Sequence, residues 1–405
     1  MRNVIEFGHE PNQPVASAYA AVVPRSSDCA SEQPAARVLI LSAGVGSGHQ
    51  SAARGLREEL LSTNPELRVR VRNGLGERNR PLRTFLERAT RWQLTRLPST
   101  YTLSYAVGVR WAPGRRLALA ALYGASRSRL AALIDAERPD VVVSTYPGIT
   151  APLGLMRQRG VLRVPVCAVV TDIAGLHFWA HPGADLHLAS YPESLEEITA
   201  ITGGAPAAAA HPPLSQTHLN GRRRCDARRD LGLAPDRPLV VVSGGGWGVG
   251  DLRGAIDAAL SLELAHVVAV CGENRKATER LGSRYAQEPR VTVLGYTDSM
   301  PDLLGAADVL VHSTGGMTCL EAAAQGCPVI AYGFSHGHVR QNVRTMVLHG
   351  LIRHAADSDE LTDELRRVLR GSATLAPSRD SAVSASTAIL GLIGRAATAP
   401  VGALQ

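Results

Sequence analysis

Short apolar runs rich in β-branched residues alternate along this chain with segments of helical periodicity, and this alternation constrains the fold more than any other feature. Strands buried on both faces of a parallel sheet need such runs, and the helices between them supply the crossover connections. The pattern therefore predicts an α/β fold with parallel sheets. The expected strands are Arg37–Ser42, Arg68–Arg72, Val141–Ser144, Val166–Thr171, Leu186–Ser190, Leu239–Ser243, Val267–Cys271, Val291–Leu294, Val309–His312 and Val329–Tyr332.

The length of 405 residues exceeds one ordinary hydrophobic core and favours two domains. A Pro/Ala-rich stretch, Ala205–Leu214, follows the fifth expected strand and is interpreted as an interdomain linker. We therefore expect two doubly wound, Rossmann-like sheets joined by one hinge. The expected divisions are a disordered leader over 1–36, a first domain over 37–205, a linker and the start of the second domain over 206–238, a second domain over 239–375, and a tail over 376–405 whose helix packs back across the hinge.

Composition and cysteine usage favour a cytoplasmic protein. The mildly apolar stretch Val15–Val23 is short and follows glutamates rather than a basic region, so we do not expect a signal peptide. We find no apolar run of the roughly 20 residues needed to cross a bilayer. The cysteines show no metal-ligand spacing and are expected to be reduced thiols; they are Cys29, Cys167, Cys225, Cys271, Cys319 and Cys327.

Positive charge is concentrated in one region of a chain whose net charge is +7. Fourteen arginines and only two glutamates lie between Arg68 and Arg129. Near an anionic membrane each basic residue contributes about 1 kcal/mol of attraction, and aromatic residues anchor at the lipid interface. The region is either a set of solvated helix faces or a membrane-binding surface, and no nucleic-acid recognition motif accompanies it. The aromatic residues among the arginines include Trp92, Tyr101, Tyr105 and Trp111.

The segment Val309–Tyr332 predicts a phosphate site. An apolar run ends in the Gly315-Gly316 turn, a helix begins near Thr318, and a second apolar run follows. Free N–H groups at the start of such a helix bind anions, most often phosphate. The carboxylate of Glu321 would repel phosphate, but it can accept hydrogen bonds from the vicinal hydroxyls of a ribose. Together these groups predict a nucleoside diphosphate site.

A second glycine-rich turn leads into a helix expected over Gln50–Leu61. A dinucleotide fold also uses such a turn, but the next strand ends at Asn73 without a carboxylate for a ribose. The chain also lacks the Gly-Lys-Ser/Thr sequence of a P-loop. His49 follows the turn, where the helix macrodipole disfavours imidazolium and favours a neutral proton acceptor. The alternative is a histidine that only caps the turn.

Glycines and polar residues follow the carboxyl ends of most expected strands. In open α/β sheets ligands bind at this edge, so two facing sheets predict one shared cleft. The loops concerned are Gly44–His49, Thr145–Gly148, Thr171–Asp172, Gly244–Gly246, Gly295–Tyr296, Ser313–Gly316 and Gly333–His338.

Two acidic groups invite a metal interpretation, which the sequence disfavours. Asp172 ends a strand and is followed by His177 and His181, but their spacing is irregular for a metal site. The Asp-x-Asp string at Asp357 and Asp359 precedes a helix and is typical of an N-cap. We expect chemistry that needs no metal and no cofactor.

Three stretches resemble the monogalactosyldiacylglycerol synthases and the bacterial processive diacylglycerol glucosyltransferases. They are Ser42–Ala52, Val169–Asp185 and Gly295–Asn342. The chain resembles, more distantly, the N-acetylglucosaminyltransferase that completes peptidoglycan lipid intermediates. The resemblance implies a GT-B fold and transfer, with inversion, of a hexose from a UDP-sugar to a lipid such as diacylglycerol at the cytoplasmic membrane face.

The resemblance also implies roles for individual residues. Gly48 and His49 match the acceptor-side glycine-histidine of the family, with His177 nearby, and Asp172 matches its Thr-Asp motif. Leaving UDP would be stabilised by backbone N–H groups. The donor-binding residues implied are Gly244, Gly245, Gly246, Gly295, Tyr296, Met300, Ser313, Gly315, Gly316, Thr318, Glu321, Gly337, His338 and Asn342.

Two departures from the family pattern shift these roles. His338 stands where a glutamine usually reads sugar hydroxyls, so the donor sugar stays open. Asn73 stands where the plant-type enzymes carry an acidic candidate base, and an amide cannot accept a proton at neutral pH. We therefore expect His49 to be the base, with Asp172 as its orienter or substitute.

Two alternatives keep the fold. A transferase of this type can act on a soluble acceptor, such as a specialised metabolite, or the chain can bind nucleotide sugars without transferring them. A nucleotide-sugar epimerase is a weaker alternative, because we see no added carboxylate pair to drive its elimination chemistry.

Overall fold

The computed structural model describes residues 35–44, 47–75, 93, 97–220, 224–233, 237–313, 315–371 and 382–398. Their strands form two six-stranded sheets in which every printed pairing is parallel. All ten strands expected from the sequence are present, and the α/β class with two doubly wound sheets is confirmed. The expected leader over 1–36 lies almost wholly outside the described residues.

The first sheet has the order β2-β1-β3-β4-β5-β6 and the second the order β12-β11-β10-β7-β8-β9. The strands of the first sheet are β1 (Arg37–Ser42), β2 (Arg68–Asn73), β3 (Val141–Ser144), β4 (Val166–Val170), β5 (Leu186–Ala189) and β6 (Ala207–Ala209). Those of the second are β7 (Leu239–Ser243), β8 (His266–Val270), β9 (Val291–Leu294), β10 (Val309–His312), β11 (Val329–Ala331) and β12 (Arg353–His354).

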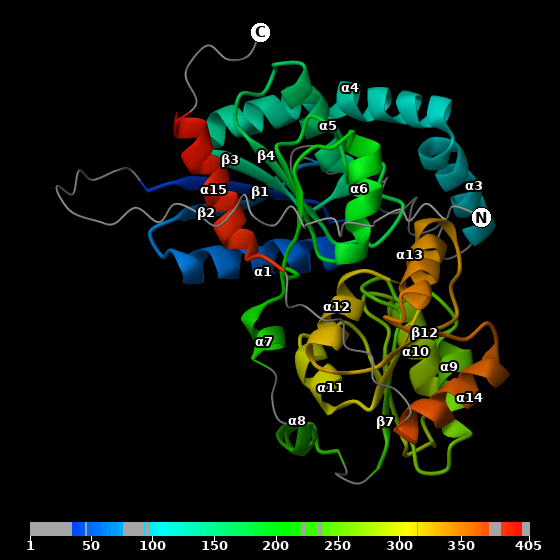
Figure 1. Ribbon diagram of the computed structural model, residues 1–405. Coiled ribbons are helices and arrows are strands. Elements are labelled where there is room, and N and C mark those ends of the chain that lie inside the picture. Colours follow the sequence, from blue (N-terminus) through cyan, green and yellow to red (C-terminus); the bar gives the residue numbers. More distant parts are fainter. Residues whose placement is uncertain are drawn as a thin grey trace, which may run out of the picture. The chain divides into compact units, whose positions relative to one another are not determined.

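Helices cover both faces of each sheet (Figure 1). The helices around the first sheet are α1 (Gly48–Thr63), α3 (Pro98–Tyr105), a π-helical turn (Ala106–Arg110), α4 (Ala112–Glu137), α5 (Pro147–Gln158), a 3₁₀ turn (Pro192–Ser194) and α6 (Leu195–Thr202). The later helices are α7 (Gln216–Leu219), α8 (Arg224–Asp230), α9 (Leu252–Leu260), α10 (Arg275–Arg284), α11 (Met300–Ala306), α12 (Met317–Ala324), α13 (Gly337–Leu348), α14 (Ser358–Leu369) and α15 (Ala385–Thr398).

The two-residue period of a strand divides the first sheet into two cores. On β1, Val38 and Ile40 pack with α1 and α15, whereas Leu39 and Leu41 pack with α4 and α5. In the second sheet Val240 and Val242 pack with α9 and α14, and Val241 packs with α11, α12 and α13. Each sheet is therefore buried on both faces, which explains its continuous apolar strands.

The interpretation of Ala205–Leu214 as a linker is wrong for Ala207–Ala209, which form β6 and pair with β5. Alanine has a low β propensity, so local composition does not announce this strand. It forms because the neighbouring strand offers unpaired backbone groups at the sheet edge. The actual connection between the sheets starts after β6, and residues 210–220 are called the connector below.

The C-terminal tail returns to the first domain. Helix α15 buries Ala385, Ile389 and Leu392 in the core beside α1 (Figure 1). At its first turn the backbone N–H of Ser386 donates to Glu59 Oε1 at 3.0 Å. The end of the chain therefore supports α1, the helix that faces the second domain.

One helix in the described part of the chain, α4, is long and apolar enough by composition to cross a membrane. The expectation that no apolar run is this long is therefore wrong for α4. Leu130 and Ile134 in its second half nevertheless pack in the core of the first domain. Only 17% of its most apolar stretch is buried, so α4 is fixed to the core by part of its length while most of its apolar surface is exposed.

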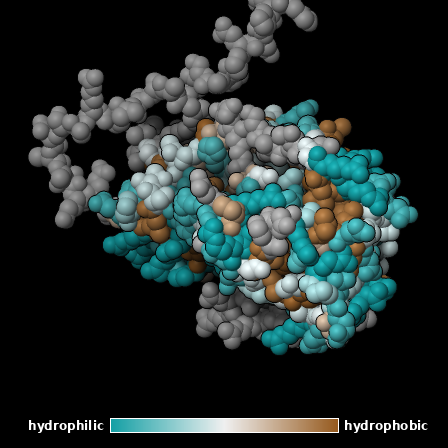
Figure 2. Space-filling model, turned by 90° about the horizontal axis from the view of Figure 1, so that it is seen from below, coloured by the Kyte–Doolittle hydropathy of each residue, from teal (hydrophilic) through white to brown (hydrophobic). Residues whose placement is uncertain are grey.

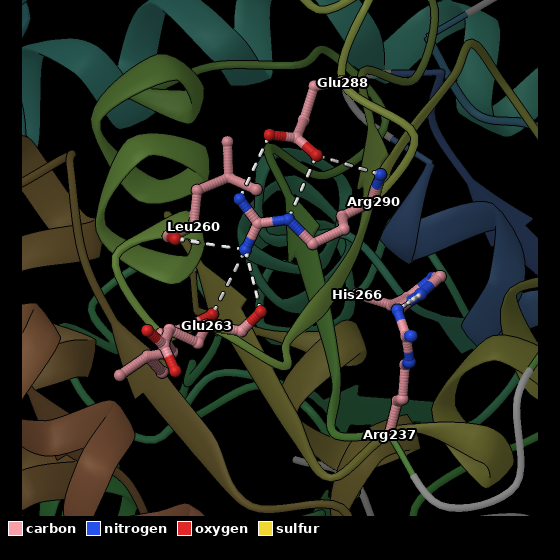
Figure 3. A network of polar contacts seen from close by, with 7 residues as sticks. Arg237, Leu260, Glu263, His266, Glu288 and Arg290 are labelled. Carbon is pink, nitrogen blue, oxygen red and sulfur yellow. Dashed lines mark hydrogen bonds and ion pairs between the residues drawn. The ribbon is translucent and has the colours of Figure 1, made fainter.

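An arginine holds the amino ends of β8 and β9 together (Figure 3). The Arg290 guanidinium donates to Glu288 Oε1 at 3.0 Å and to the carbonyls of Leu260, Leu262 and Glu263 at 3.2–3.3 Å. This hydrogen bonding lowers the pKa of the Glu288 carboxyl. The network lies at the amino ends of these strands, so the loops at their carboxyl ends are left for ligand binding.

Close packing of α1 against the connector depends on Gly55. A Cβ at this position would overlap the carbonyl oxygen of Pro213. Overpacking of this kind typically costs about 1–3 kcal/mol, so we expect Gly55→Ala to lower the melting temperature clearly. The control is Gly124→Ala in α4, where a Cβ meets nothing within 4 Å. There the lower backbone entropy of the unfolded chain should raise stability by about 0.5–1 kcal/mol. Equal melting temperatures of the two variants would contradict this packing.

Candidate active site

A cleft of about 360 Å³ lies between the two sheets at the carboxyl ends of their strands. The start of α1 forms one wall and the loops after β7, β8, β9 and β10 form the opposite wall. The connector contributes a third wall. The lining residues include Ser47, Gly48, Ser51, Arg54, Glu58, Ser215, Thr217, His218, Ser243, Gly245, Gly246, Gly272, Tyr296, Met300, Met317, Thr318 and Glu321.

The N-termini of two helices converge on this cleft. Helix α1 begins at Gly48 and α12 begins at Met317, and a Cβ at Gly48 would lie 3.4 Å from the Met317 side chain. Gly246 approaches Ser47 so closely that a Cβ there would overlap the serine hydroxyl. Both helices turn unpaired N–H groups and the positive ends of their dipoles toward the cleft. Such a site favours an anion with charge spread over two phosphates.

Glu321 forms the polar end of the cleft. Its side chain is buried, and its Oε1 accepts a hydrogen bond from Ser51 Oγ of α1 at 3.1 Å. Its Oε2 lies 3.9 Å from His218 Nε2. Burial raises the pKa of Glu321, while His218, Ser51 and Arg54 oppose that rise. A buried carboxylate held in place by residues of α1 and the connector is suited to accepting hydrogen bonds from ligand hydroxyls.

His49 lies one residue after the first residue of α1. Its ring is 5.0 Å from the Tyr146 ring and 5.7 Å from the Trp179 ring, centroid to centroid. Its Nδ1 is buried without a hydrogen-bond partner among the described residues. Burial lowers the pKa of His49, His338 adds to the lowering, and the negative charge of Asp172 opposes it. The imidazole is therefore neutral at pH 7, although desolvation rather than the helix dipole is the largest cause.

Asp172 links the two domains. Its Oδ2 accepts from Trp179 Nε1 at 2.8 Å, and its Oδ1 accepts from Asn342 Nδ2 at 3.0 Å. Asn342 in turn accepts from the backbone N–H of Ala174 at 3.0 Å. Both carboxylate oxygens therefore already hold hydrogen bonds. This arrangement gives Asp172 an electrostatic influence on His49 and makes it a weaker candidate for the base.

Helix α3, in the arginine-rich region of the first domain, contacts the second domain. The Tyr101 hydroxyl lies 2.5 Å from His338 Nδ1, and Thr102 Oγ1 accepts from the backbone N–H of Gly337 at 3.3 Å. The Tyr105 hydroxyl donates to Gln341 Oε1 at 3.2 Å. The start of α13 is thereby fastened to the first domain. His338 is engaged by a tyrosine rather than facing the nucleotide cleft.

The structure brings most of the predicted donor residues to the cleft or beneath it. Gly245, Gly246, Tyr296, Met300, Thr318 and Glu321 line it together with Gly48. Gly244, Gly295, Ser313, Gly315 and Gly316 shape the loops behind its wall, where Ser313 Oγ donates to the carbonyl of Val249 at 2.5 Å. Gly337, His338, Asn342 and His177 do not line this cleft. Val45, Gly46 and Thr314 lie outside the described residues.

Sequence patterns missed several residues in the walls. Ser51, Arg54 and Glu58 share a helix face with Gly48, so the helical period after the glycine turn was a usable signal. Ser215, Thr217 and His218 come from the connector, and no sequence pattern places them at the site. They reach the cleft only because the connector folds against α1.

The described residues contain no group of three or more histidine, cysteine or acidic side chains arranged to hold a metal ion. The expectation of chemistry without a metal or cofactor stays a prediction. The described cysteines carry free thiols, and four of these five are buried.

Two Rossmann-like domains that enclose a cleft at the carboxyl ends of their strands define the GT-B class of glycosyltransferase folds. The comparison with solved structures agrees. Arabidopsis thaliana UGT89C1 complexed with UDP superposes with a TM-score of 0.55 at 13% identity, over 89% of this chain and 99% of that one. At this identity the likeness shows the fold alone.

The sequence is similar to two families and to several lipid glycosyltransferases. Residues 49–205 match the family model of monogalactosyldiacylglycerol synthase, and residues 247–371 match that of the group 1 glycosyl transferases. Monogalactosyldiacylglycerol synthase 1 of Arabidopsis thaliana is 25% identical over 80% of this chain, which spans 63% of the plant protein. The processive diacylglycerol β-glucosyltransferase of Bacillus subtilis is 24% identical over 84% of this chain and 88% of that protein. The chain is similar in sequence to these lipid glycosyltransferases, and the resemblance read from the sequence is confirmed.

The burial of Glu321 predicts a conflict between stability and ligand binding. Because its pKa is raised in the folded state, the ionised carboxylate costs stability at neutral pH. We expect Glu321→Gln to raise the melting temperature of the free protein, since the glutamine oxygen still accepts from Ser51. The same change should weaken UDP binding about tenfold or more, because a hydrogen bond to a charged group is worth ~1.5–3 kcal/mol.

Calorimetry and thermal unfolding measure the two effects of this substitution. Glu263→Gln, at an exposed position outside the cleft, is the matched control and should change neither quantity. A Glu321→Gln variant that binds UDP as tightly as the unaltered protein would contradict the role of this carboxylate.

Proposed function

We propose that this chain transfers a hexose, with inversion, from a UDP-sugar to a hydroxyl of a diacylglycerol-like lipid at the cytoplasmic face of a membrane. One observation carries the proposal: the N-termini of α1 and α12 meet at one cleft, with Glu321 inside it and His49 beside it. The names of the two relatives support a lipid acceptor.

The second domain holds the donor. The diphosphate lies against the N-terminus of α12 and the glycine loop after β7, where Gly245 and Gly246 permit close backbone approach. The ribose hydroxyls donate to Glu321. The uracil lies near Tyr296 and Met300 after β9. As the bond between the sugar and the diphosphate breaks, the new negative charge on UDP is stabilised by backbone N–H groups.

The first domain activates the acceptor. The neutral imidazole of His49 removes the proton of the acceptor hydroxyl as its oxygen attacks the anomeric carbon from the face opposite UDP. The new glycosidic bond forms while the bond to the diphosphate breaks, so the configuration inverts. Asp172 stabilises the resulting imidazolium by its charge, an influence already present in the pKa of His49.

The segment from α3 to α4 is suited to a lipid surface. Leu103, Trp111 and Leu117 are 65%, 58% and 73% exposed. Arg110 and Arg116 are exposed beside them. Scattered apolar residues are ordinary on protein surfaces, and the face in Figure 2 also shows several. The combination of large apolar side chains with arginines is what favours an anionic membrane.

The role of His49 predicts a separation between catalysis and donor binding. We expect His49→Ala to reduce kcat by at least about a hundredfold, the contribution typical of a general base. UDP affinity should stay within about twofold, because His49 does not line the nucleotide cleft. Radiolabelled sugar transfer and calorimetry with UDP measure the two quantities. Unchanged turnover would remove His49 from the mechanism.

The lowered pKa of His49 also predicts how kcat depends on pH. Since the base acts in its neutral form, kcat should fall only below pH 6.5, the ordinary value for histidine. Asp172→Asn removes the charge that opposes the lowering, so the acid limb should move to still lower pH. A limb that moves upward would contradict the assignment.

Membrane binding has its own test. We expect the double variant Leu103→Ser/Leu117→Ser to lose about tenfold or more in partitioning to anionic vesicles, since each buried leucine is worth ~1.5–3 kcal/mol. Vesicles of phosphatidylglycerol and phosphatidylcholine are used in sedimentation. Leu348→Ser in α13, where the side chain is 81% exposed, is the control and should bind as before. An unaltered protein that ignores these vesicles would favour a soluble acceptor.

A further inference from the structure

The connector is fastened to both domains beside the cleft. From the first domain, Glu58 Oε2 accepts from the backbone N–H of Gln216 at 2.9 Å. From the second domain, Gln325 Nε2 donates to the carbonyl of His218 at 2.7 Å. Helix α7 therefore has little freedom to move relative to either helix that begins at the cleft. A side chain that α7 directs into the cleft is correspondingly well positioned.

His218 is such a side chain. It is 7% exposed, lines the cleft, and its Nδ1 lies 2.8 Å from the hydroxyl of Ser215. Its Nε2 is buried and has no hydrogen-bond partner among the described residues. Leaving a buried polar atom unsatisfied is costly, so an atom of this kind points to a missing partner. The neighbour across the cleft wall is Glu321.

The distance between the two side chains identifies that partner. His218 Nε2 and Glu321 Oε2 are 3.9 Å apart, which is too long for a hydrogen bond but leaves room for an oxygen that contacts both. When Ser215 Oγ donates to Nδ1, Nε2 carries the hydrogen and can donate. A hydroxyl can accept from Nε2–H and donate to the carboxylate. A phosphate oxygen cannot donate, and the carboxylate would repel it.

We propose that His218 and Glu321 form a ribose clamp, in which one ribose hydroxyl of the donor nucleotide accepts from His218 Nε2 and donates to Glu321 Oε2. The inference rests on the proposed UDP-sugar site and adds to it a binding residue from the connector. It makes the connector part of nucleotide recognition. It also predicts that His218 distinguishes ribonucleotides from deoxyribonucleotides.

The test compares UDP with 2′-deoxy-UDP and 3′-deoxy-UDP by calorimetry on the full chain. The unaltered protein should bind at least one deoxy analogue about a hundredfold more weakly than UDP, because two hydrogen bonds are lost. In His218→Ala only the bond to Glu321 remains to be lost. The discrimination should therefore shrink about tenfold, which is the coupling that a double-mutant cycle measures.

Two controls keep the test decisive. His218→Phe retains the ring volume without the nitrogens and replaces the alanine variant if that variant does not fold. His211→Ala removes an exposed histidine of the same connector and should leave both affinities unchanged. A purely structural role for His218 weakens UDP and the deoxy analogues by the same factor, and that result would overturn the clamp while leaving the donor site intact. An unaltered protein that does not bind UDP would overturn both.

Discussion

Helix α1 is the element on which the rest of this structure depends. Its apolar face packs on the first sheet, and α15 packs beside it in the same core. On its other face Gly48 and Gly55 have no side chain, so the second domain and the connector approach the helix backbone closely. Ser51 and Glu58 then make hydrogen bonds across these contacts. Because one helix contacts both domains, its N-terminus and that of α12 come to share a single cleft.

The buried polar groups around that cleft suit it to the two tasks that the proposed transfer requires. Glu321 provides hydrogen-bond acceptors inside the protein. Its burial desolvates the carboxylate and therefore raises its pKa. His49 is also desolvated, but because its charged form is the protonated one, burial lowers its pKa and it remains neutral. The carboxylate of Asp172 limits that fall and ties the first domain to Asn342 of α13. In the proposed mechanism donor binding and proton removal therefore fall to different groups, which the domain contact brings close together.

Sequence reasoning located the strands and the cleft edge because both follow from local regularities. Apolar runs such as Val141–Ser144 admit one interpretation when helical segments flank them, and glycines after strands mark the ligand edge. It failed at β6, where three alanines carry no strand signal and only the edge of β5 orders them. It also did not foresee that Tyr101 and Tyr105, aromatic residues of the arginine-rich region, contact His338 and Gln341 of the second domain. Contacts of this kind join residues more than two hundred positions apart, which no local pattern encodes.

The sequence by itself determined the α/β class and the two sheets, and it singled out the glycine turns, His49 and Glu321 as candidates for the site. These follow from side-chain periodicity and from the few conformations that each residue type allows. Only the tertiary structure decided that Asp172 accepts hydrogen bonds from Trp179 and Asn342. It also decided that His218 lies beside Glu321, since no sequence pattern in the connector predicts a binding residue. The reason is physical: burial and electrostatic environment are properties of the assembled cleft, and they arise only when distant segments exclude water together.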